Sequence, residues 1–152
     1  MKNTKHLVIG LGQIGTVIRD VLDTDCVDLS KDKSNFEEKN YEVLHICFSY
    51  GNEFVSTVQE YQLRFSPKIT IIRSTVPVGT SEKLFAVHSP CRGIHPNLKE
   101  GILTFVKYFG GEKAEEAACY FNDCGIRTHT HPASRNTEAM KLWDTTIYGW
   151  NI

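Results

Sequence analysis

The sequence predicts an α/β protein with a doubly wound, mostly parallel sheet, helices on both faces and a C-terminal helix. Three observations carry this prediction. Short apolar runs alternate with longer amphipathic stretches, most of the runs are uninterrupted, and a glycine-rich turn joins the first run to the first amphipathic stretch. Such alternation is typical of strand–helix–strand units, and uninterrupted runs are typical of strands that helices cover on both faces.

The composition limits the class of protein. The 152 residues suit one domain, and 17 basic against 18 acidic residues give no basic excess of the kind that nucleic-acid-binding proteins carry. No apolar run approaches the roughly 20 residues that a membrane-spanning helix needs. The first residues run directly into an apolar strand and do not resemble a signal peptide, so we expect a cytoplasmic protein.

The cysteines predict neither a disulfide framework nor a metal site. Their number, five, is odd, and no two of them form a C-x-x-C pair. We expect reduced thiols at Cys26, Cys47, Cys91, Cys119 and Cys124.

The ranges of the elements follow from the same patterns. We expect strands at 6–9, 26–29, 43–48, 69–73, 92–95 and 104–109. We expect helices at 14–22, 53–63, 81–87, 112–122 and from 137 to the C-terminus. The short connection between 29 and 43 holds at most a stub of helix around 36–39.

The turn after the first strand carries a phosphate-binding pattern. Gly10, Gly12 and Gly15 satisfy G-x-G-x-x-G between a strand and a helix, the context that a Rossmann-type dinucleotide site requires. The glycines would serve the tight turn, the approach of the backbone to pyrophosphate and the packing of helix on strand. Gln13 and Ile14 begin the helix whose N-terminus would hold the pyrophosphate. The alternative is an empty strand-to-helix turn.

An acid at the end of the second strand extends this pattern. Asp28 lies near the distance of about 20 residues beyond the glycines at which a carboxylate takes the ribose hydroxyls. Because a carboxylate repels a 2′-phosphate, Asp28 favours NAD over NADP, although Lys31 and Lys33 leave NADP open. We therefore predict an NAD-binding domain over residues 1–134, with residues 135–152 as a C-terminal helix that serves a dimer or an interdomain contact.

A longer motif carries a resemblance to a known family. Residues 71–80, Ile-Ile-Arg-Ser-Thr-Val-Pro-Val-Gly-Thr, resemble the S-T-V-P-V-G-T signature of the UDP-glucose/GDP-mannose 6-dehydrogenases, and residues 96–101 resemble that family's F-L-x-E-G segment. The likeness covers only the first domain of the family. It implies that Ser74 and Thr75 lie at the cofactor, with Thr75 beside the nicotinamide, holding substrate or a water. Ser49 follows the third strand where the family has a threonine–proline pair, and a cofactor contact there would come from the backbone.

The resemblance also implies catalytic residues. Lys141, three residues after Glu138, matches the family's catalytic lysine, which stabilises developing negative charge on oxygen. The family's asparagine one turn later is Thr145 here. Glu100 matches the acid of the E-G pair and is a candidate acid or base; the alternative is a turn acid before a glycine. For Lys141 the alternative is a solvated surface lysine.

A weaker likeness connects the segment ending in His95 and Pro96 with the prephenate dehydrogenase group, in which His95 would be an acid or base. A lone histidine that ends a strand is more often structural. None of the five cysteines has the context of the 6-dehydrogenases' nucleophile, so we do not expect a four-electron oxidation by this chain alone.

Two functions of different class therefore remain open. The first is a dehydrogenase that moves one hydride between NAD and an alcohol of a sugar nucleotide or small hydroxy acid, with Thr75, Glu100 and Lys141 around the nicotinamide. The second is a non-catalytic NAD-binding module, or half of a split or truncated dehydrogenase that lacks its substrate domain.

The last predicted helix carries an apolar stripe. Met140, Trp143, Ile147 and Trp150 recur at helical spacing, so they share one face. This stripe predicts a homodimer with both tryptophans in the contact, because an exposed stripe exceeds the apolar patch of an ordinary monomer. The alternative is a helix that folds back on its own sheet.

Overall fold

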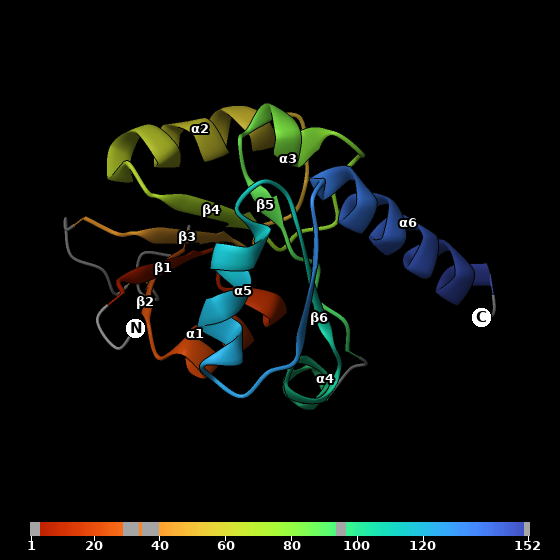
Figure 1. Ribbon diagram of the computed structural model, residues 1–152. Coiled ribbons are helices and arrows are strands. Elements are labelled where there is room, and N and C mark those ends of the chain that lie inside the picture. Colours follow the sequence, from red (N-terminus) through yellow and green to blue (C-terminus); the bar gives the residue numbers. More distant parts are fainter. Residues whose placement is uncertain (1–3, 29–33, 35–39, 94–96, 151–152) are drawn as a thin grey trace.

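The computed structural model describes residues 4–28, 34, 40–93 and 97–150. Their seven strands form one sheet in the order β2-β1-β3-β4-β5-β6-β7, flanked by helices on both faces (Figure 1). This architecture confirms the predicted α/β fold. The strands are β1 (His6–Ile9), β2 (Asp25–Val27), β3 (Val43–Ile46), β4 (Ile69–Ile72), β5 (Val87–His88), β6 (Lys107–Gly110) and β7 (Thr128–His131).

The direction of the strands decides what meets at each edge of the sheet. Strands β2, β1, β3, β4 and β5 are parallel, β6 is antiparallel to β5, and β7 is parallel to β6. The carboxyl ends of the five parallel strands therefore lie at the same edge as the amino end of β6. Open α/β sheets bind their ligands at the carboxyl edge. Lys107, the first residue of β6, is thus brought to that edge.

Helices cover the sheet in two layers. Helices α2 and α3 lie above it in Figure 1, whereas α1, α4 and α5 lie below it. Successive residues of β1 enter different cores: Val8 belongs to the core with Ile18 and Phe121, and Leu7 belongs to the core with Phe54. The helices are α1 (Gln13–Leu22), α2 (Phe54–Phe65), α3 (Thr80–Lys83), α4 (Leu98–Thr104), α5 (Ala114–Asn122) and α6 (Ser134–Trp150).

The segment around β5 corrects two expectations. The helix expected at 81–87 ends at Lys83, because Phe85 takes a positive φ of 50° and turns the chain into β5. The strand expected at 92–95 is wrong for its described part, since Arg92 and Gly93 belong to no helix or strand. A Cβ on Gly93 would lie 2.6 Å from Leu98 Cδ1, so this stretch packs closely against α4 instead.

Two elements were not expected, and two predictions lie outside the described residues. Helix α4 takes Thr104, which we expected in a strand, and β6 begins at Lys107. Strand β7 has the sequence Thr-His-Thr-His, too polar for the apolar-run criterion. The structure does not describe residues 36–39 or Leu29. The predicted helical stub and the last residue of the predicted second strand therefore cannot be compared with it.

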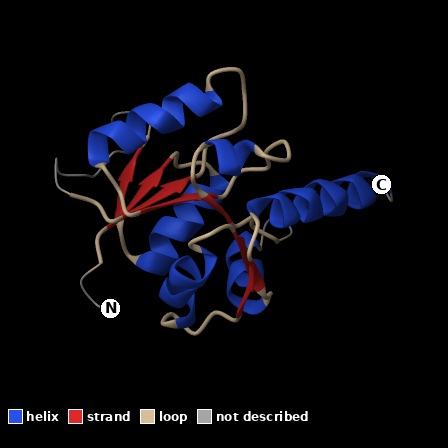
Figure 2. Cartoon of the chain, turned by 45° about the horizontal axis from the view of Figure 1, so that its top comes forward, coloured by secondary structure: helices blue, strands red, loops and turns tan. Residues whose placement is uncertain are grey.

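Helix α6 is buried at its start and exposed beyond it. Thr137 and Glu138 are fully buried, whereas Trp143 is 69% and Trp150 is 88% exposed. Figure 2 shows the helix projecting from the body of the domain. The start of α6 thus packs on the sheet, whereas Trp143 and Trp150 stay exposed. None of the described helices combines the length and apolar character required to cross a membrane.

Candidate functional site

The three glycines of the turn after β1 are needed for three different reasons. Gly10 has a φ of +93°, and a Cβ on it would lie 2.9 Å from the Phe48 nitrogen. A Cβ on Gly15 would lie 1.8 Å from the Gly10 carbonyl oxygen, so this glycine allows α1 to pack on the turn. A Cβ on Gly12 would meet nothing within 4 Å. Gly12 thus faces open space at the start of α1.

That space has the character of an anion site. Gly12 is the N-cap of α1, no side chain caps the helix there, and its first turn holds no acid. Gln13 and Ile14 are the first two residues of the helix, so their N–H groups belong to the helix N-terminus. Such a terminus carries a partial positive charge and attracts phosphate.

A cavity of about 600 Å³ adjoins the turn, and we call it the glycine-loop cavity. Gly10, Gly12, Asp28 and Ser49 line it, together with Tyr61 from α2. Its volume lies within the range of about 300–1,000 Å³ that is usual for ligand sites. Asp28 Oδ2 accepts a hydrogen bond of 2.6 Å from the Leu11 nitrogen, which fixes the carboxylate beside the turn. Lys31 and Lys33 lie outside the described residues.

The two hydroxyl residues after β4 differ in exposure. Ser74 is buried, and its hydroxyl donates to the Phe48 carbonyl, so it ties the loop after β4 to the loop after β3. Thr75 is exposed and does not line the glycine-loop cavity. The predicted cofactor contacts of both residues stay predictions.

Glu138 and His88 hold α6 to the S-T-V-P-V-G-T segment. The buried Glu138 carboxylate accepts from the Gly79 nitrogen at 2.6 Å and from the Ser81 nitrogen at 2.8 Å. His88 lies 2.9 Å from Thr137 Oγ1 and 3.2 Å from the Ser74 carbonyl oxygen. Neither role has a local sequence pattern, since the partners lie up to 59 positions apart.

Burial lowers the pKa of His88 to about 4, so the imidazole is neutral at pH 7. A carbonyl oxygen only accepts hydrogen bonds, so Nε2 donates to Ser74. Nδ1 then accepts from the Thr137 hydroxyl. This arrangement joins β5, the loop after β4 and α6.

A second cavity, of about 260 Å³, lies between α4, β6 and α6, and we call it the lysine cavity. Lys141 and Lys107 line it, and Lys141 Nζ donates to the Cys91 carbonyl oxygen at 3.2 Å. Arg92 and Asp144 lie on its wall with 3.5 Å between their charged atoms. Lys141 is therefore part of a cavity rather than an isolated surface cation.

The three predicted catalytic residues do not share one cavity. Lys141 lines the lysine cavity, whereas Thr75 and Glu100 are exposed and line neither this cavity nor the glycine-loop cavity. Glu100 lies on α4, directly before Gly101 on the wall of the lysine cavity. The Thr145 hydroxyl, at the position of the family's asparagine, donates to the Lys141 carbonyl at 2.8 Å. His95 falls outside the described residues.

Two buried cations, Arg73 and Lys107, were not predicted. Arg73 is 1% exposed and its guanidinium lies 4.5 Å from the centre of the Phe121 ring; burial lowers its pKa to about 10. Lys107 is 4% exposed, and burial lowers its pKa to about 8. The sequence feature that could have indicated a buried cation is a basic residue directly after an apolar run, as Arg73 follows Ile71 and Ile72.

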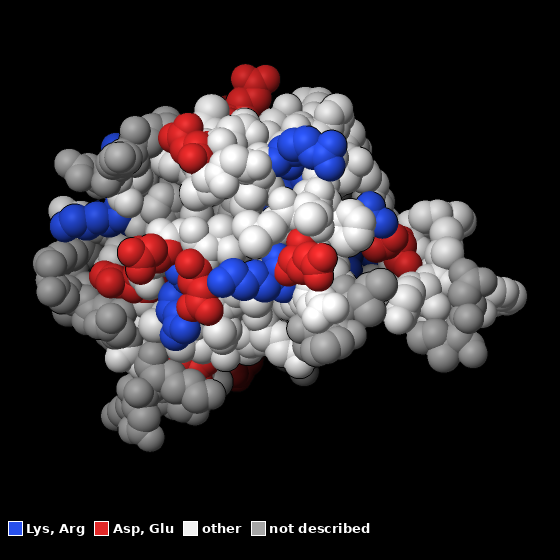
Figure 3. All heavy atoms as spheres, turned by 90° about the horizontal axis from the view of Figure 1, so that it is seen from below, with Lys and Arg blue, Asp and Glu red and all other residues white. Residues whose placement is uncertain are grey.

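One face of the molecule is mixed in charge. On the face that Figure 3 shows, acidic and basic side chains are interspersed. Among the described residues, no group of three or more histidines, cysteines and acids is arranged to hold a metal ion.

No family model matches the sequence, and no curated protein matches it either. Solved structures do match. The UDP-D-ManNAc dehydrogenase of Pyrococcus horikoshii aligns over 94% of this chain and 50% of its own, with a TM-score of 0.79 and 16% identity. The UDP-N-acetyl-mannosamine dehydrogenase Cap5O of Staphylococcus aureus aligns over 95% and 51%, with a TM-score of 0.72 and 19% identity.

A reductive aminase of Aspergillus terreus, solved in complex with NADPH, aligns over 97% of this chain and 62% of its own, with a TM-score of 0.72 and 11% identity. The chain thus spans about half the length of the two dehydrogenases. At these identities the comparisons show a shared fold. The chain has the α/β fold that sugar-nucleotide dehydrogenases and a reductive aminase have in common.

Proposed function

We propose that the chain binds NAD in the glycine-loop cavity and takes part in transferring one hydride between NAD and an alcohol carbon of a small molecule or sugar nucleotide. One observation carries the proposal. Gly12 faces open space at an uncapped helix N-terminus, and the cavity beside it also holds the carboxylate of Asp28. These are the two contacts that a dinucleotide makes in a site of this fold.

The residues fit the parts of the cofactor one by one. The pyrophosphate would lie over Gly12, against the N–H groups of Gln13 and Ile14, with Gly10 and Gly15 shaping the turn. Asp28 would accept from the ribose hydroxyls and repel a 2′-phosphate, which favours NAD over NADP. Ser49, Ser74 and Thr75 follow β3 and β4 at the same edge and would meet the nicotinamide half.

The chemistry would be the oxidation of an alcohol to a carbonyl or its reverse. NAD, when bound, supplies the acceptor of the hydride. The ammonium group of Lys141 would stabilise negative charge on the substrate oxygen, as a positioned cation does. Thr75 would hold the substrate or a water, and Glu100 would take the hydroxyl proton as the carbonyl forms.

A second candidate function is NAD binding without catalysis by this chain alone. The exposure of Thr75 and Glu100 outside both cavities favours it, as does the span of about half the length of the matching dehydrogenases. In this case a further domain or a partner would complete the site.

We also propose that α6 pairs with a second copy of the chain. The support is its exposed apolar face, with Met140 40%, Trp143 69%, Ile147 44% and Trp150 88% exposed. Light scattering should give a dimer mass for the parent and a monomer mass for Trp143→Glu. A monomeric parent would contradict this assignment. We also propose a cytoplasmic location, because none of the five cysteines forms a disulfide in the described part of the chain.

The proposal is tested by activity and binding on the same sample. NAD titration measures the glycine-loop cavity, and NADH formation over a panel of sugar nucleotides and hydroxy acids measures catalysis. Binding with turnover supports the dehydrogenase, and binding without turnover supports the non-catalytic module. Absence of binding overturns both.

A further inference from the structure

The lysine cavity brings two ammonium groups to one short stretch of backbone. Lys107 Nζ lies 3.5 Å from the Pro90 carbonyl oxygen and 3.4 Å from Cys91 Sγ. Lys141 Nζ lies 3.2 Å from the Cys91 carbonyl oxygen. The two lysines come from different elements, β6 and α6, and both line the cavity. Two like charges that share neighbouring partners repel each other, and an anion between them would offset this repulsion.

No acid of the described chain balances these charges. Neither Lys107 nor Lys141 forms an ion pair with a described carboxylate, and the acid on the cavity wall, Asp144, lies beside Arg92. Lys107 is nonetheless 4% exposed. A buried cation is costly unless it is paired, and the carbonyl and thiol that it contacts are neutral partners. An anion bound in this cavity would supply the opposite charge that these partners lack.

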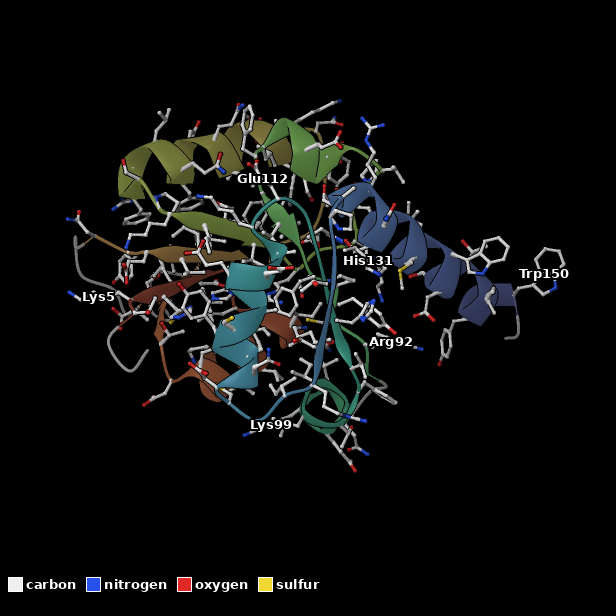
Figure 4. The ribbon with its side chains drawn as sticks, in the orientation of Figure 1. Lys5, Arg92, Lys99, Glu112, His131 and Trp150 are labelled. Atoms are coloured by element: carbon white, nitrogen blue, oxygen red, sulfur yellow. The ribbon has the colours of Figure 1, made fainter. Side chains whose placement is uncertain are left out.

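The other walls of the cavity are mainly apolar, and their polar members are Arg92, Tyr108, Thr137 and Asp144. Ile102 and Phe105 come from α4 and its end, and Met140, Trp143 and Ile147 come from the same face of α6 that carries the proposed dimer contact. Figure 4 shows Arg92 beneath α6, on the side of β6 and α4. Two of these polar side chains already have partners, since the Thr137 hydroxyl contacts His88 and Ser134 and the Asp144 carboxylate lies 3.5 Å from the Arg92 guanidinium. The volume of about 260 Å³ is below the usual range for drug-sized ligands.

We propose that the lysine cavity binds a small carboxylate with an apolar body, the carboxylate lying between Lys107 and Lys141 and the body against α4 and α6. This inference rests on the proposed function, because the bound carboxylate would be the substrate of the proposed hydride transfer. The position agrees with that role. Residues that follow β5 line the lysine cavity, and residues that follow β1 and β3 line the glycine-loop cavity. Both cavities therefore lie at the carboxyl edge of the sheet.

The test uses isovalerate as the probe and ligand-observed NMR as the measurement, with no NAD present. Isovaleramide is the uncharged control of the same shape, and UDP-glucose is the sugar-nucleotide control. We expect saturable binding of isovalerate that is at least tenfold tighter than that of either control. Equal binding of isovaleramide would overturn the role of the cations, and tighter binding of UDP-glucose would overturn the ligand class.

Two variants locate the binding. Lys107→Met keeps the shape of the buried side chain without its charge, and should weaken isovalerate binding at least tenfold. Lys113→Met is the matched control, because Lys113 is exposed and donates to the Lys68 carbonyl away from this cavity. If Lys107→Met does not fold, Lys141→Gln makes the same test from α6. Unchanged isovalerate binding in the folded variant would overturn the proposal.

NAD titration of the same samples separates the two proposals. Isovalerate binding without NAD binding would support the carboxylate site and contradict the proposed function. NAD binding without isovalerate binding does the reverse.

Discussion

The two cavities at the carboxyl edge of the sheet differ in which parts of the chain form their walls, backbone in one and side chains in the other. The glycine-loop cavity is made mainly by backbone: Gly12 leaves a helix N-terminus open, and Asp28 is held by a peptide nitrogen. The lysine cavity is made by side chains that converge from α4, β6 and α6. The first should therefore be sensitive to any added Cβ, and the second to the loss of single charges or of the contacts that hold α6.

The largest expected effect is on the backbone-built cavity. Gly12→Val should abolish NAD binding, because the new side chain fills the space above the helix N-terminus, while the free energy of unfolding stays within about 0.5 kcal/mol of the parent. Calorimetric titration and urea unfolding measure the two quantities. Gly149→Val is the control, since that glycine also faces open space but lies on α6.

A neighbouring glycine sharpens the contrast. Gly15→Ala should lower the free energy of unfolding by about 3 kcal/mol or more, because its Cβ would lie 1.8 Å from the Gly10 carbonyl oxygen. If Gly12→Val unfolds the protein, or binds NAD like the parent, our account of the glycine loop is wrong.

The next effect concerns the charge of the lysine cavity. If the chain turns over a substrate, Lys141→Met should reduce kcat on the order of a hundredfold with no change in NAD affinity, because the cation contacts the substrate and not the cofactor. Lys83→Met, at the exposed end of α3, serves as the control. A variant with the parental kcat would show that Lys141 has only a structural role, its hydrogen bond to the Cys91 carbonyl.

A smaller effect should follow from loosening α6. Glu138→Gln leaves one oxygen where two accept from the Gly79 and Ser81 nitrogens, and should cost about 1–3 kcal/mol of unfolding free energy. Glu82→Gln breaks an exposed pair with Arg135 and should cost less than about 1 kcal/mol. Equal losses in urea unfolding would mean that Glu138 does not clamp the helix.

The same clamp predicts a modest dependence on pH. The folded pKa of His88, about 4, lies below the unfolded value of 6.5, so the unfolded chain binds more protons between these values and stability falls as the pH falls. This one histidine should contribute about 1 kcal/mol of loss between about pH 7 and about pH 5.5. His6, with a pKa lowered to about 4, acts in the same direction. Urea unfolding of His88→Gln should show a shallower pH dependence, and an unchanged slope would count against a buried neutral His88.

The glycine-loop cavity could be predicted from sequence because its parts are close in the chain. Gly10, Gly12 and Gly15 lie within one turn, and Asp28 follows at a spacing that the strand–helix–strand unit fixes. The boundaries of β1, α1 and α5 were predicted within two residues for the same reason.

The lysine cavity could not be predicted in this way. Its lysines lie 34 positions apart, counted from Lys107 to Lys141, and the tertiary fold brings them to one cavity, Lys107 from the antiparallel strand β6 and Lys141 from α6. Helix α4 contains Gly101 and a mixed sequence without a clear apolar face, and β7 is too polar to read as a strand. Long-range contacts such as Glu138 with Gly79 leave no local pattern.

The central claim is that the glycine-loop cavity binds NAD, and calorimetric titration of the intact chain with NAD and with NADP tests it most directly. We predict micromolar binding of NAD and at least tenfold weaker binding of NADP, because Asp28 accepts from ribose hydroxyls and repels a phosphate. Binding of neither dinucleotide would contradict the claim. NADP binding as tight as NAD binding would show that Asp28 does not contact the ribose, and only the role of the glycine turn would remain supported.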